Sequence, residues 1–209
     1  MTAYTKRLQK VTAVLCTTAL LAGCAAGTSD NTEPAATTAQ VKAITIEPTA
    51  AYQTMNGFGA SACWWSQEVG NWENAKDILS LLYDENSGIG LNIYRYNLGA
   101  GSKDDATITD PDRRAEAFID KDGSYHWERD AAAQNALALA KSMNKDLRVT
   151  LFSNSAPVFY TANGKAYCDY LPDDEKYVTN LEPERYADFA KYSIACAKHF
   201  TEAGYRVTG

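Results

Sequence analysis

Residues 90–99 read Gly-Leu-Asn-Ile-Tyr-Arg-Tyr-Asn-Leu-Gly. A turn over 87–90 precedes a run of apolar and aromatic residues, which predicts a strand over 91–96. Apolar residues at helical spacing predict one helix before it, over 71–83 with Asn71 as N-cap, and one after it, over 127–143. A strand set between two helices is the repeating unit of a parallel sheet.

The same alternation continues on both sides. Further strands are expected near Ile44, over 52–59, 147–153 and 205–208, and a third helix is expected to start at Pro183. The sheet could be doubly wound or closed as a barrel. A (β/α)8 barrel is favoured because long, aromatic-rich loops follow the strands and no Gly-x-Gly-x-x-Gly motif follows a strand. Since such a barrel needs roughly 250 residues, 43–209 is expected to be its N-terminal half, in a truncated α/β chain.

The N-terminus has the features of an export signal. A short apolar run over 11–21 follows three basic residues and leads into Leu-Ala-Gly-Cys, which ends at Cys24 and resembles a bacterial lipobox. We therefore expect a lipoprotein signal peptide over 1–23, lipid attachment at Cys24, and a flexible tether over 24–42. The alternative is an ordinary secretory signal. Either way the expected location is extracytoplasmic, with a membrane partner if Cys24 is acylated.

Composition excludes some functions. The 20 basic and 26 acidic residues give a net charge of −6 without a basic stripe, which argues against a nucleic-acid partner. No disulfide framework is indicated by Cys63, Cys168 and Cys196, so free thiols are favoured. One disulfide bond between two of them is the alternative. Neither Cys-x-x-Cys nor paired histidines occur, and we predict no metal and no cofactor.

Three stretches carry a resemblance to a known family. They are Asn-Gly-Phe-Gly-Ala-Ser over 56–61, followed by a Trp pair, then residues 90–99, and Phe-Ser-Asn-Ser-Ala-Pro over 152–157. In this order and spacing they resemble the family-30 glycoside hydrolases, particularly the galactanase-like branch. The resemblance implies a (β/α)8 barrel with an accessory β-sandwich, whose first strand would lie near Ile44. It also implies retaining hydrolysis by two glutamates, both expected beyond Gly209, so the fragment alone is predicted to be inactive.

The resemblance also implies a set of substrate-binding residues. Arg95 matches the family's second-strand arginine, on one strand face with Leu91 and Ile93, where its charge would keep the nucleophile ionised. A surface salt bridge is the alternative role for Arg95. Asn154 is expected to bind a sugar hydroxyl or to cap a loop. The remaining candidates are two stacking tryptophans, of which one is expected to pack in the core, and two residues at the same rim: Trp64, Trp65, Asn97 and Ser153.

Three groups of carboxylates lie in loops or at a helix start, and we expect them to be solvated: Asp104 and Asp105, residues 173–175, and Glu182 with Glu184. The predicted function is a retaining glycoside hydrolase that cleaves a β-linked polysaccharide, with β-1,6-galactan favoured. A non-catalytic carbohydrate-binding lipoprotein on the same scaffold is the first alternative. A solute-binding protein with two doubly wound lobes is the second.

Overall fold

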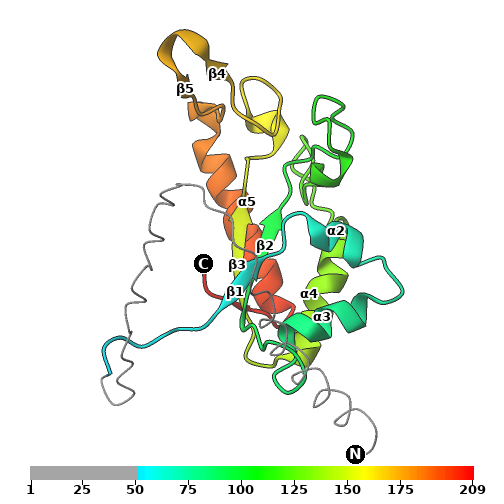
Figure 1. Ribbon diagram of the computed structural model, residues 1–209. Coiled ribbons are helices and arrows are strands. Elements are labelled where there is room, and N and C mark those ends of the chain that lie inside the picture. Colours follow the sequence, from blue (N-terminus) through cyan, green and yellow to red (C-terminus); the bar gives the residue numbers. More distant parts are fainter. Residues whose placement is uncertain (1–50) are drawn as a thin grey trace, which may run out of the picture. The chain divides into compact units, whose positions relative to one another are not determined.

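The computed structural model describes residues 51–209. The signal peptide, Cys24, the tether and the strand near Ile44 lie outside the described residues. Within 51–209, a four-stranded sheet forms from β1 (Gly59–Ser61), β2 (Ile93–Leu98), β3 (Arg148–Ser153) and β6 (Arg206–Val207) (Figure 1). All three strand pairings are parallel, and the order β1-β2-β3-β6 follows the chain. The predicted α/β class with a parallel sheet is confirmed.

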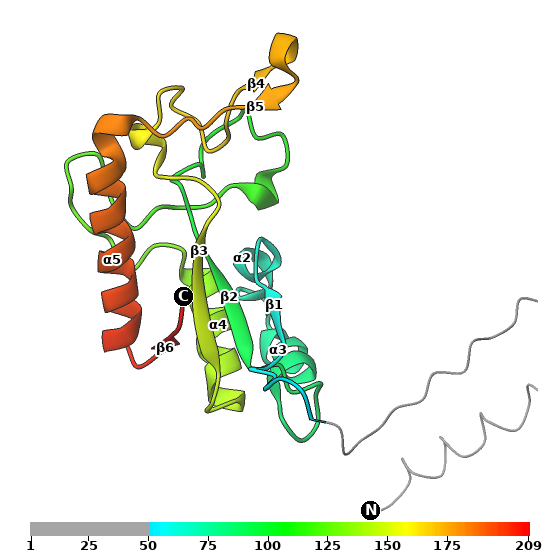
Figure 2. The same ribbon diagram turned by 90° about the vertical axis from the view of Figure 1, so that its left-hand side faces the viewer.

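The helices cover a single face of this sheet. They are α2 (Trp65–Val69), α3 (Ala75–Tyr83), α4 (Ala131–Met143) and α5 (Tyr186–Glu202). Tyr94 and Tyr96, two residues apart on β2, point into this layer and are fully buried. The ring centroids of Tyr94 and Tyr83, which lies on α3, are 5.5 Å apart. Those of Tyr96 and Phe200, which lies on α5, are 4.9 Å apart. Figure 2 shows the strands in front of α4, with α5 at one side.

Strand order and helix placement decide between the two parallel architectures. A doubly wound sheet reverses its strand order at a switch point and carries helices on both faces. Here the order does not reverse, and one apolar cluster joins residues of α3, α4 and α5. This arrangement is that of successive (β/α) units in a barrel, and it does not support the doubly wound lobes of a solute-binding protein.

Several predicted boundaries were wrong, each for a reason that depends on contacts. The first strand begins at Gly59, where the parallel register with β2 starts; before it, the Phe58 carbonyl accepts from the Asn92 and Ile93 amides. Residues 71–74 complete the turn that ends α2, with the Asn71 and Trp72 amides donating to carbonyls in α2, so the helix predicted over 71–83 starts at Ala75. Asp130 has a left-handed φ of 54°, which no helix accommodates, so the helix predicted from 127 starts at Ala131.

Other predicted features are confirmed. Pro183 opens a 3-10 turn, Pro183–Arg185, that leads directly into α5. Asn144 ends α4, and its side-chain amide donates to the Leu91 carbonyl at 3.1 Å. A hairpin that the sequence did not predict, β4 (Tyr170–Leu171) with β5 (Lys176–Tyr177), extends from the loop after β3.

Cys63, Cys168 and Cys196 are free thiols, so no bridge joins them. Burial raises the pKa of the Cys196 thiol to about 12. No helix within 51–209 is long and apolar enough to cross a membrane.

Candidate active site

A pocket of about 380 Å³ lies where the strands end at their C-terminal edge. Parallel-sheet enzymes bind substrates at this edge because the loops after the strands converge there, and Figure 2 shows these loops gathered beyond β2 and β3. The pocket brings together three of the predicted residues with three others from the neighbouring loops: Trp64, Asn97, Asn154, Arg113, Tyr167 and Cys168. Its lining within the described chain contains no Asp or Glu.

Asn97 is the most informative residue in the pocket. It is the fifth residue of β2 and only 7% exposed, yet its Oδ1 has no hydrogen-bond partner among residues 51–209. A buried polar atom without a partner costs about 1–3 kcal/mol. Asn97 also lines the pocket, but its Oδ1 is itself buried, so the side chain must turn towards the pocket before Oδ1 can accept from a ligand hydroxyl.

The tryptophan pair divides as predicted between pocket and core. Trp64 lines the pocket, and the guanidinium carbon of Arg113 lies 5.2 Å from the centroid of its ring. Trp65 starts α2, donates its indole N–H to the Ser61 carbonyl at 2.9 Å, and packs against the apolar cluster. Of the two tryptophans, Trp64 lines the pocket and Trp65 does not.

The end of β3 contributes one pocket residue. Asn154 is exposed and lines the pocket. Ser153 is not part of the lining, and its hydroxyl donates to the Ser155 carbonyl at 2.6 Å. Ser153 thus shapes the turn that presents Asn154, while Asn154 is free to contact a ligand.

Arg95 lies on the sheet face away from the helices, below the pocket. Its side chain lines a second cavity of about 280 Å³ together with Ile93. The guanidinium carbon stacks 3.4 Å from the Phe152 centroid, and Nη1 lies 3.5 Å from Ser61 Oγ. No carboxylate of residues 51–209 forms a salt bridge with Arg95.

Leu91 does not share this face. It precedes β2 and packs against the apolar cluster on the helix side, so that part of the prediction was wrong. The reason is that β2 begins at Ile93. The regular alternation of side chains between the two sheet faces starts there and does not extend back to Leu91.

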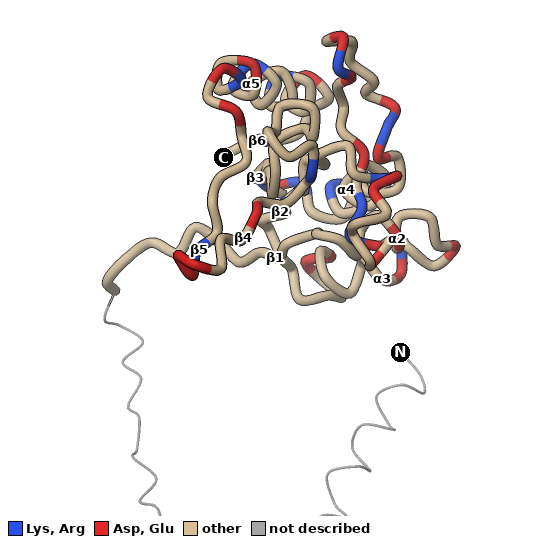
Figure 3. The backbone as a smooth tube through the Cα atoms, turned by 90° about the horizontal axis from the view of Figure 1, so that it is seen from above, with Lys and Arg blue, Asp and Glu red and all other residues tan. Residues whose placement is uncertain are grey.

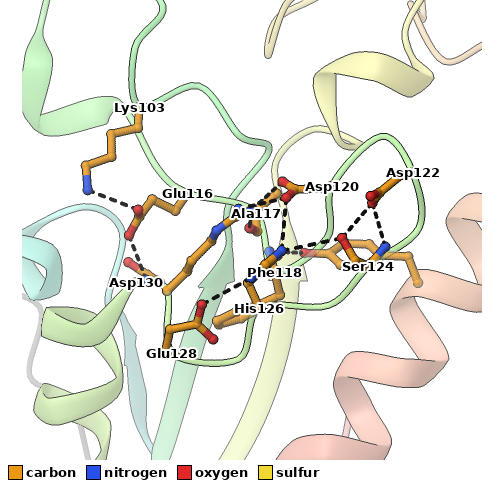
Figure 4. A network of polar contacts seen from close by, with 12 residues as sticks. Lys103, Glu116, Ala117, Phe118, Asp120, Asp122, Ser124, His126, Glu128 and Asp130 are labelled. Atoms are coloured by element: carbon orange, nitrogen blue, oxygen red, sulfur yellow. Dashed lines mark hydrogen bonds and ion pairs between the residues drawn. The ribbon is translucent and has the colours of Figure 1, made fainter.

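Sequence reasoning missed a buried carboxyl at the start of α4. Asp130 is 6% exposed; its Oδ2 accepts from the Tyr96 hydroxyl at 2.6 Å, and its amide donates to Glu116 Oε2 at 2.8 Å. Lys103 Nζ in turn lies 3.0 Å from Glu116 Oε1 (Figure 4). Burial raises the pKa of the Asp130 carboxyl to about 7. In the sequence Asp130 lies in the first turn of the helix predicted over 127–143, where an acidic residue is ordinary, so no signal indicated its burial.

Asp130 belongs to the helix layer and not to the pocket, because Tyr96 points away from the face that carries Arg95. A second network near it joins Arg129 and His126 to Asp120, at 2.7 and 3.0 Å, and fixes the loop that follows β2 (Figure 4). Among residues 51–209 no three His, Cys, Asp or Glu side chains are arranged to hold a metal ion.

The chain is an α/β protein with a pocket at the C-terminal edge of a parallel sheet, the edge at which barrel enzymes bind their substrates. Residues 41–208 match the model of O-glycosyl hydrolase family 30, and the chain belongs to this family of glycosyl hydrolases.

Two kinds of relative support this assignment. An endo-beta-1,6-galactanase from Hypocrea rufa is 29% identical over 180 residues, which cover 75% of this chain and 36% of that protein. The crystal structure of a conserved exported protein from Bacteroides fragilis superposes with a TM-score of 0.70 at 28% identity, covering 78% of this chain and 35% of that one.

A third comparison concerns the fold alone. The endo-beta1,6-glucanase BT3312 superposes with a TM-score of 0.53 at 17% identity, over 77% of this chain and 35% of that one. The chain thus spans about a third of the length of the relatives it matches.

Proposed function

We propose that the whole protein is a retaining glycoside hydrolase that cleaves a β-linked polysaccharide, with β-1,6-galactan as the preferred substrate. The observation that carries this proposal is the pocket at the strand ends, whose lining contains two aromatic residues, Trp64 and Tyr167, and two amides, Asn97 and Asn154, without any Asp or Glu in its described part. Rings and amides are suited to the apolar faces and hydroxyls of neutral sugars. The likeness to an endo-beta-1,6-galactanase supports the choice of galactan.

The proposed architecture is a closed (β/α)8 barrel with an accessory β-sandwich. The four strands in chain order would be the first four of eight, and the strand expected near Ile44 would belong to the sandwich. Closure of the barrel would enclose the sheet face that carries Arg95, which is the face without helices among the described residues.

The proposed chemistry uses two glutamates on later strands, about 5–5.5 Å apart. One protonates the glycosidic oxygen as the other attacks the anomeric carbon, which breaks the C–O bond and leaves a covalent glycosyl-enzyme. The first, now a carboxylate, takes a proton from water, which attacks the same carbon and frees the nucleophile. Arg95 would hold that nucleophile ionised, since a fixed positive charge favours the carboxylate form.

We further propose that the protein acts outside the cytoplasm, held to a membrane or cell surface by acyl chains on Cys24. The basic residues, the apolar run and the Leu-Ala-Gly-Cys sequence before the domain support this location. A lipid anchor suits an enzyme that meets its polymeric substrate outside the cell.

The test is to assay the full-length protein for release of reducing ends from β-1,6-galactan, β-1,6-glucan, β-1,4-galactan and xylan. We expect activity on a β-linked polymer, with β-1,6-galactan cleaved fastest. Retention of the protein in a galactan-containing gel without any release of reducing ends would instead favour the non-catalytic binding protein. Inactivity on all four polymers together with no retention would refute both.

A further inference from the structure

The β4–β5 hairpin presents two aromatic side chains to solvent. Tyr170 and Tyr177 are directly opposite each other in the antiparallel register, so they lie on the same face. Their ring centroids are 5.0 Å apart, and the residues are 47% and 73% exposed. No fold-stabilising burial explains this pair within residues 51–209, because neither residue belongs to the apolar cluster.

The hairpin is a continuation of the pocket. Tyr167 lines the pocket, and its hydroxyl donates to Thr107 Oγ1 at 2.9 Å, which ties the loop after β3 to the loop after β2. The Asn180 side chain donates to the Tyr167 carbonyl at 3.0 Å and closes the base of the hairpin. Only two residues lie between Tyr167 and Tyr170, so the two tyrosines are three residue steps apart, a span of roughly 10 Å at most.

The charges on the hairpin restrict what can bind there. Four acidic residues surround the aromatic pair, Asp169, Asp173, Asp174 and Glu175, and the single Lys176 is paired with Asp174 at 3.0 Å. Figure 3 shows the acidic segment at the hairpin beyond the strands. Excess negative charge disfavours nucleic acids, acidic glycans and anionic lipid surfaces. The rings remain available to an uncharged ligand with flat apolar faces.

From this geometry we propose that Tyr170 and Tyr177 form a stacking platform for a sugar unit of a neutral polysaccharide, beyond the units held in the pocket. The inference rests on the proposed function and extends it, since an additional sugar-binding site makes long polysaccharide chains better substrates than short ones. A glycan that passes Trp64 and Tyr167 reaches the platform only if it is long enough. The platform therefore contributes to the binding of polymers and leaves short oligosaccharides unaffected.

The experiment measures kcat/KM of the full-length protein on β-1,6-linked galacto-oligosaccharides from the disaccharide to the octasaccharide. We expect Tyr170→Ala and Tyr177→Ala each to lower kcat/KM roughly 2- to 12-fold on the longest substrates, by the usual contribution of one aromatic contact, and to leave the shortest unchanged. Tyr177→Phe keeps the ring face and should retain activity near wild type. Trp72→Ala is the matched control, because Trp72 is a 50% exposed aromatic residue between α2 and α3.

Equal effects of the hairpin variants on short and long substrates, or no effect on either, would overturn the platform while leaving the hydrolase intact. Wild-type protein that hydrolyses no galacto-oligosaccharide would refute the proposed substrate, and retention in a galactan gel then decides the platform. Retention of wild type and Tyr177→Phe, but not of the double Ala variant, would support it. Equal retention of all three, or of none, would overturn it.

Discussion

Replacing Asp130 by Asn should make the protein's stability much less dependent on pH. The Asp130 carboxyl is 6% exposed and accepts a hydrogen bond from the Tyr96 hydroxyl at 2.6 Å. Asn preserves the shape and an acceptor oxygen for Tyr96, but it cannot ionise. It also tolerates the left-handed φ of 54° at this position, where Ala would add backbone strain.

The size of the expected change in the free energy of unfolding follows from the pKa of the Asp130 carboxyl. Burial raises the pKa of Asp130 from 3.8 to about 7, which corresponds to about 4 kcal/mol of free energy. Well below pH 3.8 the carboxyl is protonated in the folded and the unfolded chain, and the full stability is present. As the pH rises towards 7, the unfolded chain releases the proton and the folded one keeps it, so stability falls; the loss is complete above the folded pKa.

The groups facing Asp130 do not cancel this effect. Burial acts to raise the pKa of Glu116, but hydrogen bonds from the Asp130 amide and Lys103 lower it more, so Glu116 stays ionised from pH 5 to 8. Burial raises the pKa of Tyr96 well above its ordinary range, so its hydroxyl stays protonated.

Urea unfolding of both proteins at pH 4, 6 and 8 measures the difference directly. We expect Asp130→Asn to be about as stable as wild type at pH 4 and up to about 4 kcal/mol more stable at pH 8. Parallel curves of stability against pH for the two proteins would refute the reasoning, because Asp130 would then titrate alike in both states.

Three further predictions concern the pocket and the helix packing. Arg95→Ala should lower kcat about 100-fold and change KM little, because its charge acts on the nucleophile; unchanged turnover would remove Arg95 from the site. Trp64→Ala should raise KM roughly 2- to 12-fold in steady-state assays, and an unaltered KM would exclude stacking. Gly70→Ala places a Cβ 1.8 Å from the Ala132 carbonyl oxygen and should cost about 1–3 kcal/mol in urea unfolding, whereas a neutral effect would show that α2 and α4 separate freely.

Local sequence signals were enough to predict the order of the four sheet strands and of helices α3, α4 and α5. Pro183 and Asn144 set the limits of helices α5 and α4 through backbone chemistry that acts within a few residues. The family resemblance singled out Asn97 and Asn154, and both line the pocket because the ends of neighbouring parallel strands meet at one edge.

Features that depend on distant contacts could not be predicted. Helix α2 is too short to show periodicity, and its end at Gly70 is determined by close packing against Ala132 of α4. Because Trp64 and Trp65 are neighbours in the sequence, the sequence does not indicate which of the two lines the pocket. Asp130 becomes unusual only when Tyr96 and the helix layer bury it.

The proposed mechanism is tested most directly by the configuration of the first product. Proton NMR of the full-length protein acting on β-1,6-galactan distinguishes the anomers before they interconvert. A retaining enzyme with two closely spaced glutamates must release the β-anomer first. Initial release of the α-anomer would contradict the account, because a single displacement by water would then replace the covalent intermediate.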